Sequence, residues 1–186
     1  MSTELEITNQ ELSVVRPPEE VIEQARKCAT ALKQIVDQKK KPVFIKGDQY
    51  LTFEDWQTLG RFYSLSAKVE RTMSISLGEA KGWEATAVAI NTISGQEVSR
   101  ADAMCLNNED NWKDKPEFTL RSMAQTRACV KALRNVLAWV VVLAGYQPTP
   151  VEEMDGVDTK PTNQPVQSKQ SPEDFITEKQ RKRMFA

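Results

Sequence analysis

Hydrophobic positions along this chain follow a helical period, then a strand period, then a helical period again. From residue 17 to residue 38, apolar side chains recur every three or four positions after a Pro-Pro pair, which predicts a helix. Two short runs at residues 43–45 and 50–52 then flank a turn at Gly47-Asp48, which predicts a β-hairpin.

A shorter second helix is predicted over residues 53–65. Thr52 stands at its N-cap position and Asp55 follows three residues later, which is the spacing of a capping box. The bulky apolar residues of this segment recur at helical spacing: Trp56, Leu59, Phe62 and Tyr63. Such a cluster packs into a protein core more often than it stacks on nucleic-acid bases.

Three β-strands are predicted next, at residues 67–77, 82–93 and 97–106. Their side chains alternate, which indicates one face against the core and one face in water. A tight turn at residues 94–96 joins the second strand to the third, so we expect an antiparallel meander. One face of the second strand carries small side chains against which the following helix packs closely: Ala85, Ala87 and Ala89.

The longest periodic segment starts after a polar loop at residues 107–116 and ends at Gly145. At about 100° per residue its apolar side is formed by Cys129, Leu133, Val136, Leu137, Val140 and Leu143. Arg127, Lys131 and Arg134 fall on the opposite side and need water or an anionic partner. This helix holds four basic residues against one acid in a chain of net charge −1, so positive charge is concentrated here.

These elements predict a single α+β domain over residues 17–150. It comprises an N-terminal helix, a hairpin, a short helix and a three-stranded antiparallel meander packed on a long C-terminal helix. Residues 1–16 are polar and are expected to be disordered. Residues 151–186 read as a disordered acidic linker, rich in Pro, Gln, Ser and Thr, with a short basic tip. No secretory signal and no membrane span is predicted.

Composition narrows the possible chemistry. The chain contains no histidine, which removes Ser-His and Cys-His nucleophile pairs, His-ligated metals and imidazole bases. Its three cysteines are widely spaced and form no CxxC pair, so neither a zinc site nor a disulfide framework is predicted. They fit a reducing intracellular compartment. We therefore expect a protein that is not an enzyme and that uses no metal and no cofactor.

Four blocks of sequence resemble phage and prophage proteins that accompany recombination functions. The blocks are YLTFEDWQTLG (50–60), GWEATAVAI (82–90), ADAMCLNNEDNW (101–112) and SMAQTRACVKALRNVLAWVVVLAGYQPTPVEEM (122–154). The predicted order of three strands and then a long helix also resembles the single-strand annealing superfamily (Rad-fifty-two-type, with Erf, RecT and Redβ phage relatives). In that superfamily, the sheet and the following helix line a basic groove, and protomers form rings or filaments on single-stranded DNA.

The resemblance implies ATP-independent binding and annealing of single-stranded DNA in phage homologous recombination, in the cytoplasm of a bacterial host. The matching stretch at residues 126–134 contains Arg127, Lys131 and Arg134. They lie about one helical turn apart, on the order of 5–6 Å, close to the phosphate spacing along one strand. Further candidate DNA-binding residues come from the same helix and from the strands: Arg121, Lys68, Arg71 and Arg100.

The expected partners follow from the same resemblance. They are single-stranded DNA, further copies of the chain joined at exposed edges of the meander, and a single-strand DNA-binding protein or replication factor docked through the tail. No membrane partner is expected.

Three other interpretations stay open at this point. In the first, Arg127 pairs with Glu117, Glu109 or Asp102 and holds the loop over the sheet, while the rest of the basic stripe is solvated. In the second, the chain is a non-enzymatic module that docks a replication or host factor through its acidic tail or an apolar patch. In the third, Glu79-Ala80-Lys81 is half of a metal-dependent nuclease site, although it lies in a predicted turn.

Overall fold

The computed structural model describes residues 16–154. Helix α1 (Pro18–Asp37) leads into a hairpin formed by β1 (Val43–Ile45) and β2 (Asp48–Tyr50), and helix α2 (Phe53–Phe62) follows. All four elements were predicted, but the second hairpin strand starts at Asp48 rather than at residue 50, because the two-residue turn lies at Lys46-Gly47, where both residues have positive φ. The second helix ends three residues earlier than its pattern indicated, because the chain turns at Ser64 in a left-handed conformation (φ 55°) and enters the sheet.

A three-stranded antiparallel meander comes next, in the order β3 (Leu65–Leu77), β4 (Ala80–Asn91) and β5 (Glu97–Leu106). Helix α3 (Glu117–Leu143) packs along it, and a single 3₁₀ turn, η1 (Val151–Glu153), follows. The α+β fold predicted from the pattern is confirmed.

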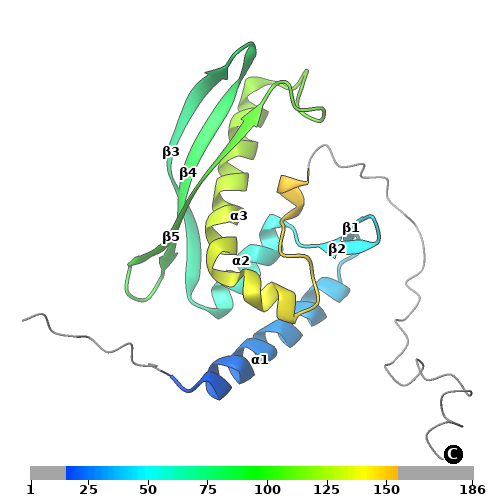
Figure 1. Cartoon of the computed structure of the whole chain (residues 1–186), viewed down its shortest axis with the longest axis vertical. Helices are drawn as coiled ribbons and strands as arrows, with labels where there is room; N and C mark the ends of the chain where they lie inside the picture. The colour runs from blue at the N-terminus through cyan, green and yellow to red at the C-terminus, as the bar shows by residue number, and fades with distance from the viewer. Residues whose placement is uncertain (1–15, 155–186) are drawn as a thin grey trace, which may run out of the picture.

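Helix α3 lies between two layers (Figure 1). The β3-β4-β5 sheet covers one side of its N-terminal part. Helices α1 and α2 and the β1-β2 hairpin gather around its C-terminal part, on the other side. The face of the sheet that points away from α3 is not covered by any other described element, so it stays open to solvent.

Small residues make the contact between sheet and helix close. Ala85 and Ala87 of β4 are buried against Ala124 and Ala128 of α3, as the run of alanines on one face of this strand predicted. Because each of these four side chains is a methyl group, they leave room for the helix backbone to lie close to the strand.

The second part of the core surrounds the C-terminal half of α3. Helix α1 contributes Leu32 and Val36, helix α2 contributes Trp56 and Leu59, and all four side chains are at most 1% exposed. Because apolar partners lie on both sides here, α3 buries side chains on more than one side between Val130 and Val141: Val130, Ala132, Leu133, Leu137, Val140 and Val141.

The single apolar side predicted for α3 is therefore wrong in two respects. Leu143, expected in the core, is 49% exposed because it lies at the end of the helix. Arg127, expected to face outward, is only 8% exposed, since the loop after β5 and the turn η1 fold over it.

The domain also extends past its predicted end. The acidic linker was expected to start at residue 151, but Val151–Glu153 form η1 and contact α3 and α2, and Pro150 before them is fully buried. The predicted N-terminal tail up to residue 15, and the linker and basic tip from residue 155 onward, lie outside the described residues. Within residues 16–154, no helix is both long enough and apolar enough to cross a membrane.

Candidate functional site

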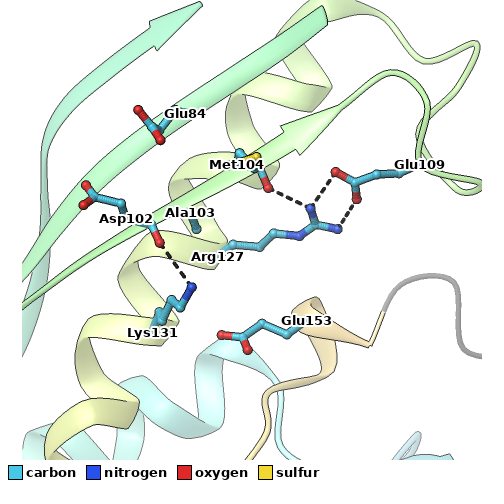
Figure 2. Close-up of a pocket in the computed structure, with 8 residues that line it drawn as sticks. All are labelled: Glu84, Asp102, Ala103, Met104, Glu109, Arg127, Lys131 and Glu153. Atoms are coloured by element: carbon cyan, nitrogen blue, oxygen red, sulfur yellow. Dashed lines mark hydrogen bonds and ion pairs between the residues drawn. The ribbon is translucent and has the colours of Figure 1, made fainter. Parts of the chain in front are cut away.

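A cleft of about 380 Å³ lies where α3 passes the outer edge of β5 (Figure 2). Its charged residues come from β4, β5, the loop after β5, α3 and η1: Glu84, Asp102, Glu109, Arg127, Lys131 and Glu153. Two of the predicted DNA-binding residues, Arg127 and Lys131, therefore meet in one cleft. They share it with four carboxylates, so the cleft as it stands is acidic rather than basic.

Three side chains of α3, spaced four residues apart, donate hydrogen bonds to alternate carbonyls of β5. The three bonds are Arg127 Nη1 to Met104 O (2.8 Å), Lys131 Nζ to Asp102 O (3.3 Å) and Asn135 Nδ2 to Arg100 O (3.3 Å). Four residues of helix rise about 6 Å and two residues of strand span about 6.7 Å, so steps of four along the helix match steps of two along the strand.

These three hydrogen bonds occupy carbonyls of β5 that a further strand would need for pairing. The prediction that the meander edges are exposed is therefore wrong at β5, whose edge is covered by side chains of α3. The other edge of the sheet is formed by β3.

The guanidinium of Arg127 lies at the centre of a buried network. Its Nη1 and Nη2 atoms contact the two carboxylate oxygens of Glu109 at 3.0 and 2.7 Å, and Nε donates to the carbonyl of Glu152 at 2.9 Å. Of the three partners considered from the sequence, Glu109 is thus confirmed. Arg127 ties α3 to β5, to the following loop and to η1, and its donors point into the protein rather than into solvent.

The other two residues of the basic stripe differ from each other. Arg134 Nη1 lies 2.8 Å from Glu153 Oε2, with 31% and 22% of the two side chains exposed. Lys131 has no ion-pair partner within residues 16–154, and its side chain donates one long hydrogen bond there, to Asp102 O at 3.3 Å. Lys131 is therefore the cation of this stripe that a phosphate can reach without breaking an ion pair.

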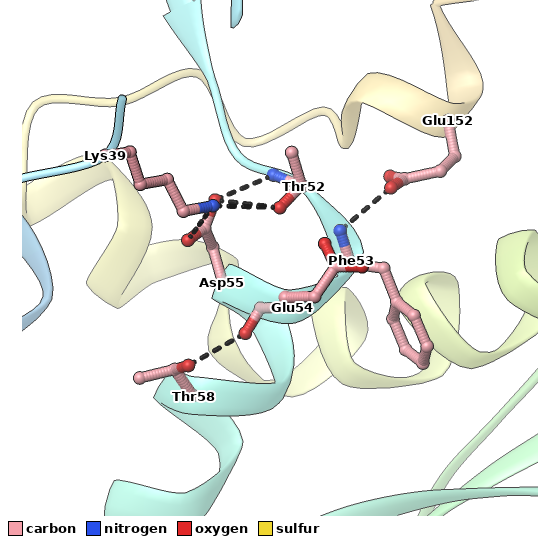
Figure 3. Close-up of polar contacts among 7 residues, drawn as sticks. All are labelled: Lys39, Thr52, Phe53, Glu54, Asp55, Thr58 and Glu152. Carbon is pink, nitrogen blue, oxygen red and sulfur yellow. Dashed lines mark hydrogen bonds and ion pairs between the residues drawn. The ribbon is translucent and has the colours of Figure 1, made fainter. Parts of the chain in front are cut away.

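Acidic side chains gather at the N-terminus of α2 (Figure 3). Asp55 accepts a hydrogen bond from the backbone N–H of Thr52 at 2.9 Å, which confirms the predicted capping box, and it also pairs with Lys39 at 2.6 Å. Glu152 accepts from the N–H of Phe53 at 2.8 Å, although it is 99 residues away in the chain. The pKa of Glu54 lies below its usual value, chiefly because its carboxylate bonds its own backbone N–H and the Thr52 hydroxyl. Exposed N–H groups and the helix dipole attract these anions.

Three of the predicted residues lie on the open face of the sheet. Lys68 and Arg100 flank Val88 in one row across the strands, and Arg71 lies in the next row. Arg100 pairs with Glu97 at 2.7 Å and with Glu70 at 2.5 Å. The hydrogen bond to Glu97 is the main cause that raises the pKa of Arg100, and the hydrogen bond to Glu70 is the second. Lys68 and Arg71 have no ion-pair partner in the described part of the chain.

The last predicted residue, Arg121, lies away from the cleft. Its guanidinium stacks 5.3 Å from the ring centre of Trp83, near the N-terminal end of α3. The seven predicted residues therefore divide among four places: the cleft (Arg127 and Lys131), the ion pair with Glu153 (Arg134), the open face of the sheet (Lys68, Arg71 and Arg100) and the Trp83 ring (Arg121).

Sequence reasoning missed the residues that neutralise the basic stripe or extend it. Asn135 was not singled out, although it stands four residues after Lys131 and so had a signal in the helical spacing. Glu152 and Glu153 lie in the segment that composition predicts to be a disordered linker, so the sequence gives no signal for their contacts. Glu79 lies in the β3–β4 turn, as the sequence predicted, and no group of three or more Cys, Asp or Glu suited to a metal occurs among residues 16–154.

No family model matches the chain, and no curated protein or solved structure is significantly similar to it.

Proposed function

We propose that this protein binds single-stranded DNA along the cleft beside β5 and the open face of the sheet, and that it anneals complementary strands without ATP. The observation that carries the proposal is the position of Lys131. Its ammonium group lies on a cleft that reaches both α3 and the open sheet face, and it has no ion-pair partner among the described residues. The order of a three-stranded meander and then a long helix, which resembles the single-strand annealing superfamily, agrees with this function.

A path for the DNA backbone follows from the strand register. Asp102 lines the cleft and shares a row of the open face with Thr86 and Arg71. Two strand spacings, about 10 Å, separate the β5 edge from β3, which carries Lys68 and Arg71. A backbone that runs from Lys131 across this face meets unpaired cations at both ends, and its bases are left free to meet a complementary strand.

The balance of charge predicts weak binding by one protomer. Four carboxylates line the cleft, and Arg100 on the open face is already paired with Glu70 and Glu97. Because only a few cations per protomer are available, stable binding requires several protomers on one strand, as in a phage recombination filament or ring. Arg127 is not part of the proposed contact surface, since its donors are used inside the chain.

The test is fluorescence anisotropy of a labelled single-stranded oligonucleotide at several salt concentrations, without ATP. Lys131→Glu is compared with Lys33→Glu, which makes the same charge change on exposed α1, away from the cleft. We expect Lys131→Glu to weaken binding roughly tenfold and to reduce the salt slope by about 0.7 per lost phosphate contact. Lys33→Glu is expected to stay within about twofold of the natural protein.

Two results oppose this function. Equal losses for the two variants mean that only net charge matters and that the cleft is not the site. No binding by the folded natural protein at low salt overturns the function itself. Wherever binding is found, annealing of complementary oligonucleotides is then measured directly.

A second candidate function is supported by exposed apolar side chains near the end of α3. Trp139, Val142 and Leu143 are 43–56% exposed. Such a surface favours a module that docks another protein. This candidate predicts no salt-dependent DNA affinity, so the same titration separates the two functions.

A further inference from the structure

Residues 151–154 lie beside the basic stripe of α3, and Figure 2 shows Glu153 near Arg127 and Lys131. Glu153 Oε2 lies 2.8 Å from Arg134 Nη1, and the main-chain oxygen of Glu152 accepts from Arg127 Nε at 2.9 Å. We call residues 151–154 the acidic strap. The strap brings a carboxylate to Arg134, one helical turn from Lys131, at the cleft where the proposed function requires phosphates to bind.

The strap also reaches the N-terminus of α2 (Figure 3). The Glu152 carboxylate accepts from the N–H of Phe53 at 2.8 Å, and the N–H of Val151 donates to Leu51 O at 3.1 Å. Its two consecutive carboxylates are thus bound by a helix N-terminus and by a guanidinium group. Both are groups that bind phosphate as readily as carboxylate.

Polar contacts, rather than buried apolar surface, hold the strap in place. No residue of η1 is buried, whereas Pro150 immediately before it is fully buried. The Arg134–Glu153 pair is partly exposed and is weakened by water and salt. A segment of this kind opens locally without unfolding the domain, and Pro150 remains as its anchor.

We infer that the acidic strap is an autoinhibitory element, which holds Arg134 in the place of a DNA phosphate and is displaced by single-stranded DNA. The inference rests on the proposed function, since it names the regulation of the same site. One guanidinium fork binds Glu153 or a phosphate, but not both in the same geometry. When the strap lifts, the Arg134 guanidinium becomes available to a phosphate beside Lys131. Glu153 then leaves the cleft, which keeps three of its four carboxylates.

The test compares two matched variants of the whole chain. Glu153→Gln removes the charge that holds Arg134 while keeping the shape of the side chain. Glu152→Gln removes the same charge one residue earlier, where the side chain faces α2 instead of Arg134. By anisotropy, Glu153→Gln is expected to bind single-stranded DNA about 3- to 10-fold more tightly, with a salt slope larger by about 0.7. Glu152→Gln is expected to have a much smaller effect, because its amide oxygen still accepts from the Phe53 N–H and the Arg134–Glu153 pair is kept.

A second measurement needs no variant. Hydrogen exchange follows the N–H of Val151 in the natural protein, with and without a saturating single-stranded oligonucleotide. Displacement of the strap predicts faster exchange at Val151 in the complex, while the N–H groups of the sheet keep their protection.

The outcomes separate the two proposals. If the natural protein binds DNA, but Glu153→Gln binds no more tightly and Val151 stays protected, the strap is structural and the inference is overturned while the proposed function stands. If neither folded protein binds DNA at low salt, the proposed function fails, and the inference fails with it. If Glu153→Gln does not fold, exchange at Val151 in the natural protein decides.

Discussion

Arg127 and Glu109 form a two-pronged ion pair, with Nη1 3.0 Å from Oε1 and Nη2 2.7 Å from Oε2. The arginine side chain is 9% exposed and the glutamate side chain 27%, so water screens the pair only partly. Arg127 also donates to Met104 O and Glu152 O, so a single side chain joins α3 to three neighbouring segments. A buried arginine with this many partners organises the fold around it.

We predict that Arg127→Ala destabilises the domain by about 3–5 kcal/mol, because it leaves the Glu109 carboxylate and two carbonyls without their donor. Arg127→Lys is also expected to be destabilising, since a lysine ammonium does not reproduce the two-pronged geometry. Urea unfolding followed by circular dichroism measures both losses.

The matched control is Arg100→Ala. Arg100 also contacts two carboxylates, but it lies on the open face of the sheet, and we expect a much smaller change there. Similar unfolding free energies for the Arg127 and Arg100 variants would contradict a special role for the buried pair.

The elements of this fold were predictable because each has a local signal. The period of the apolar residues, the Thr52-Asp55 capping spacing and the turn at Gly95 act over a few residues, and each marks an element that the structure contains, although α2 ends earlier than its pattern indicated. The close packing of α3 on β4 was also predictable, since a run of alanines on one face leaves room for a helix backbone.

The partners of the basic stripe were less predictable, because they come from irregular segments. Glu109 follows β5 and Glu153 follows the end of α3, and no period connects either with Arg127 or Arg134. A helical wheel also assumes the same surroundings along the whole helix. Helix α3 has a sheet beside its first half and two helices beside its second half, so its buried side changes along its length.

Gly82 gives a prediction about the sheet itself. It pairs with Leu106 across β4 and β5, and a Cβ atom added at Gly82 would lie 2.0 Å from the carbonyl oxygen of Cys105. Because that neighbour is backbone within a strand, the two strands must separate locally to accept a methyl group. We expect Gly82→Ala to cost about 3 kcal/mol in unfolding free energy, measured by urea titration.

Gly95→Ala separates this steric effect from ordinary glycine strain. Gly95 has φ 73° in the β4–β5 turn, with no atom within 4 Å of the added Cβ. The expected cost there is about 1 kcal/mol, from the left-handed backbone alone. If Gly82→Ala lowers the unfolding free energy no more than Gly95→Ala does, then β4 and β5 do not approach each other this closely at Cys105.

The three cysteines are expected to react at different rates with an alkylating reagent. Cys105 and Cys129 are buried, whereas Cys28 is partly exposed on α1. Burial raises the pKa of Cys129 to about 11, so at pH 8 only about one molecule in a thousand carries its reactive thiolate. Mass spectrometry after brief labelling at pH 8 is therefore expected to find the label on Cys28. Rapid labelling of Cys129 in the folded protein would show that this thiol is not enclosed.

The same burial makes the stability of the domain depend on alkaline pH. An unfolded chain releases the Cys129 proton near pH 9.0, while the folded protein keeps it to about pH 11, so the folded state binds more protons in this range. The stabilisation is complete below about pH 9 and is lost as pH rises through 11.

Cys129→Ala removes this contribution, and its unfolding free energy is expected to fall less steeply from pH 9 to pH 11 than that of the natural protein. Burial raises the pKa of Tyr146 to about 12 as well, and that part of the decline is expected to persist in the variant at higher pH. Urea titrations at a series of pH values, with a reducing agent present, measure both slopes, and parallel curves for the two proteins would contradict the assignment to Cys129.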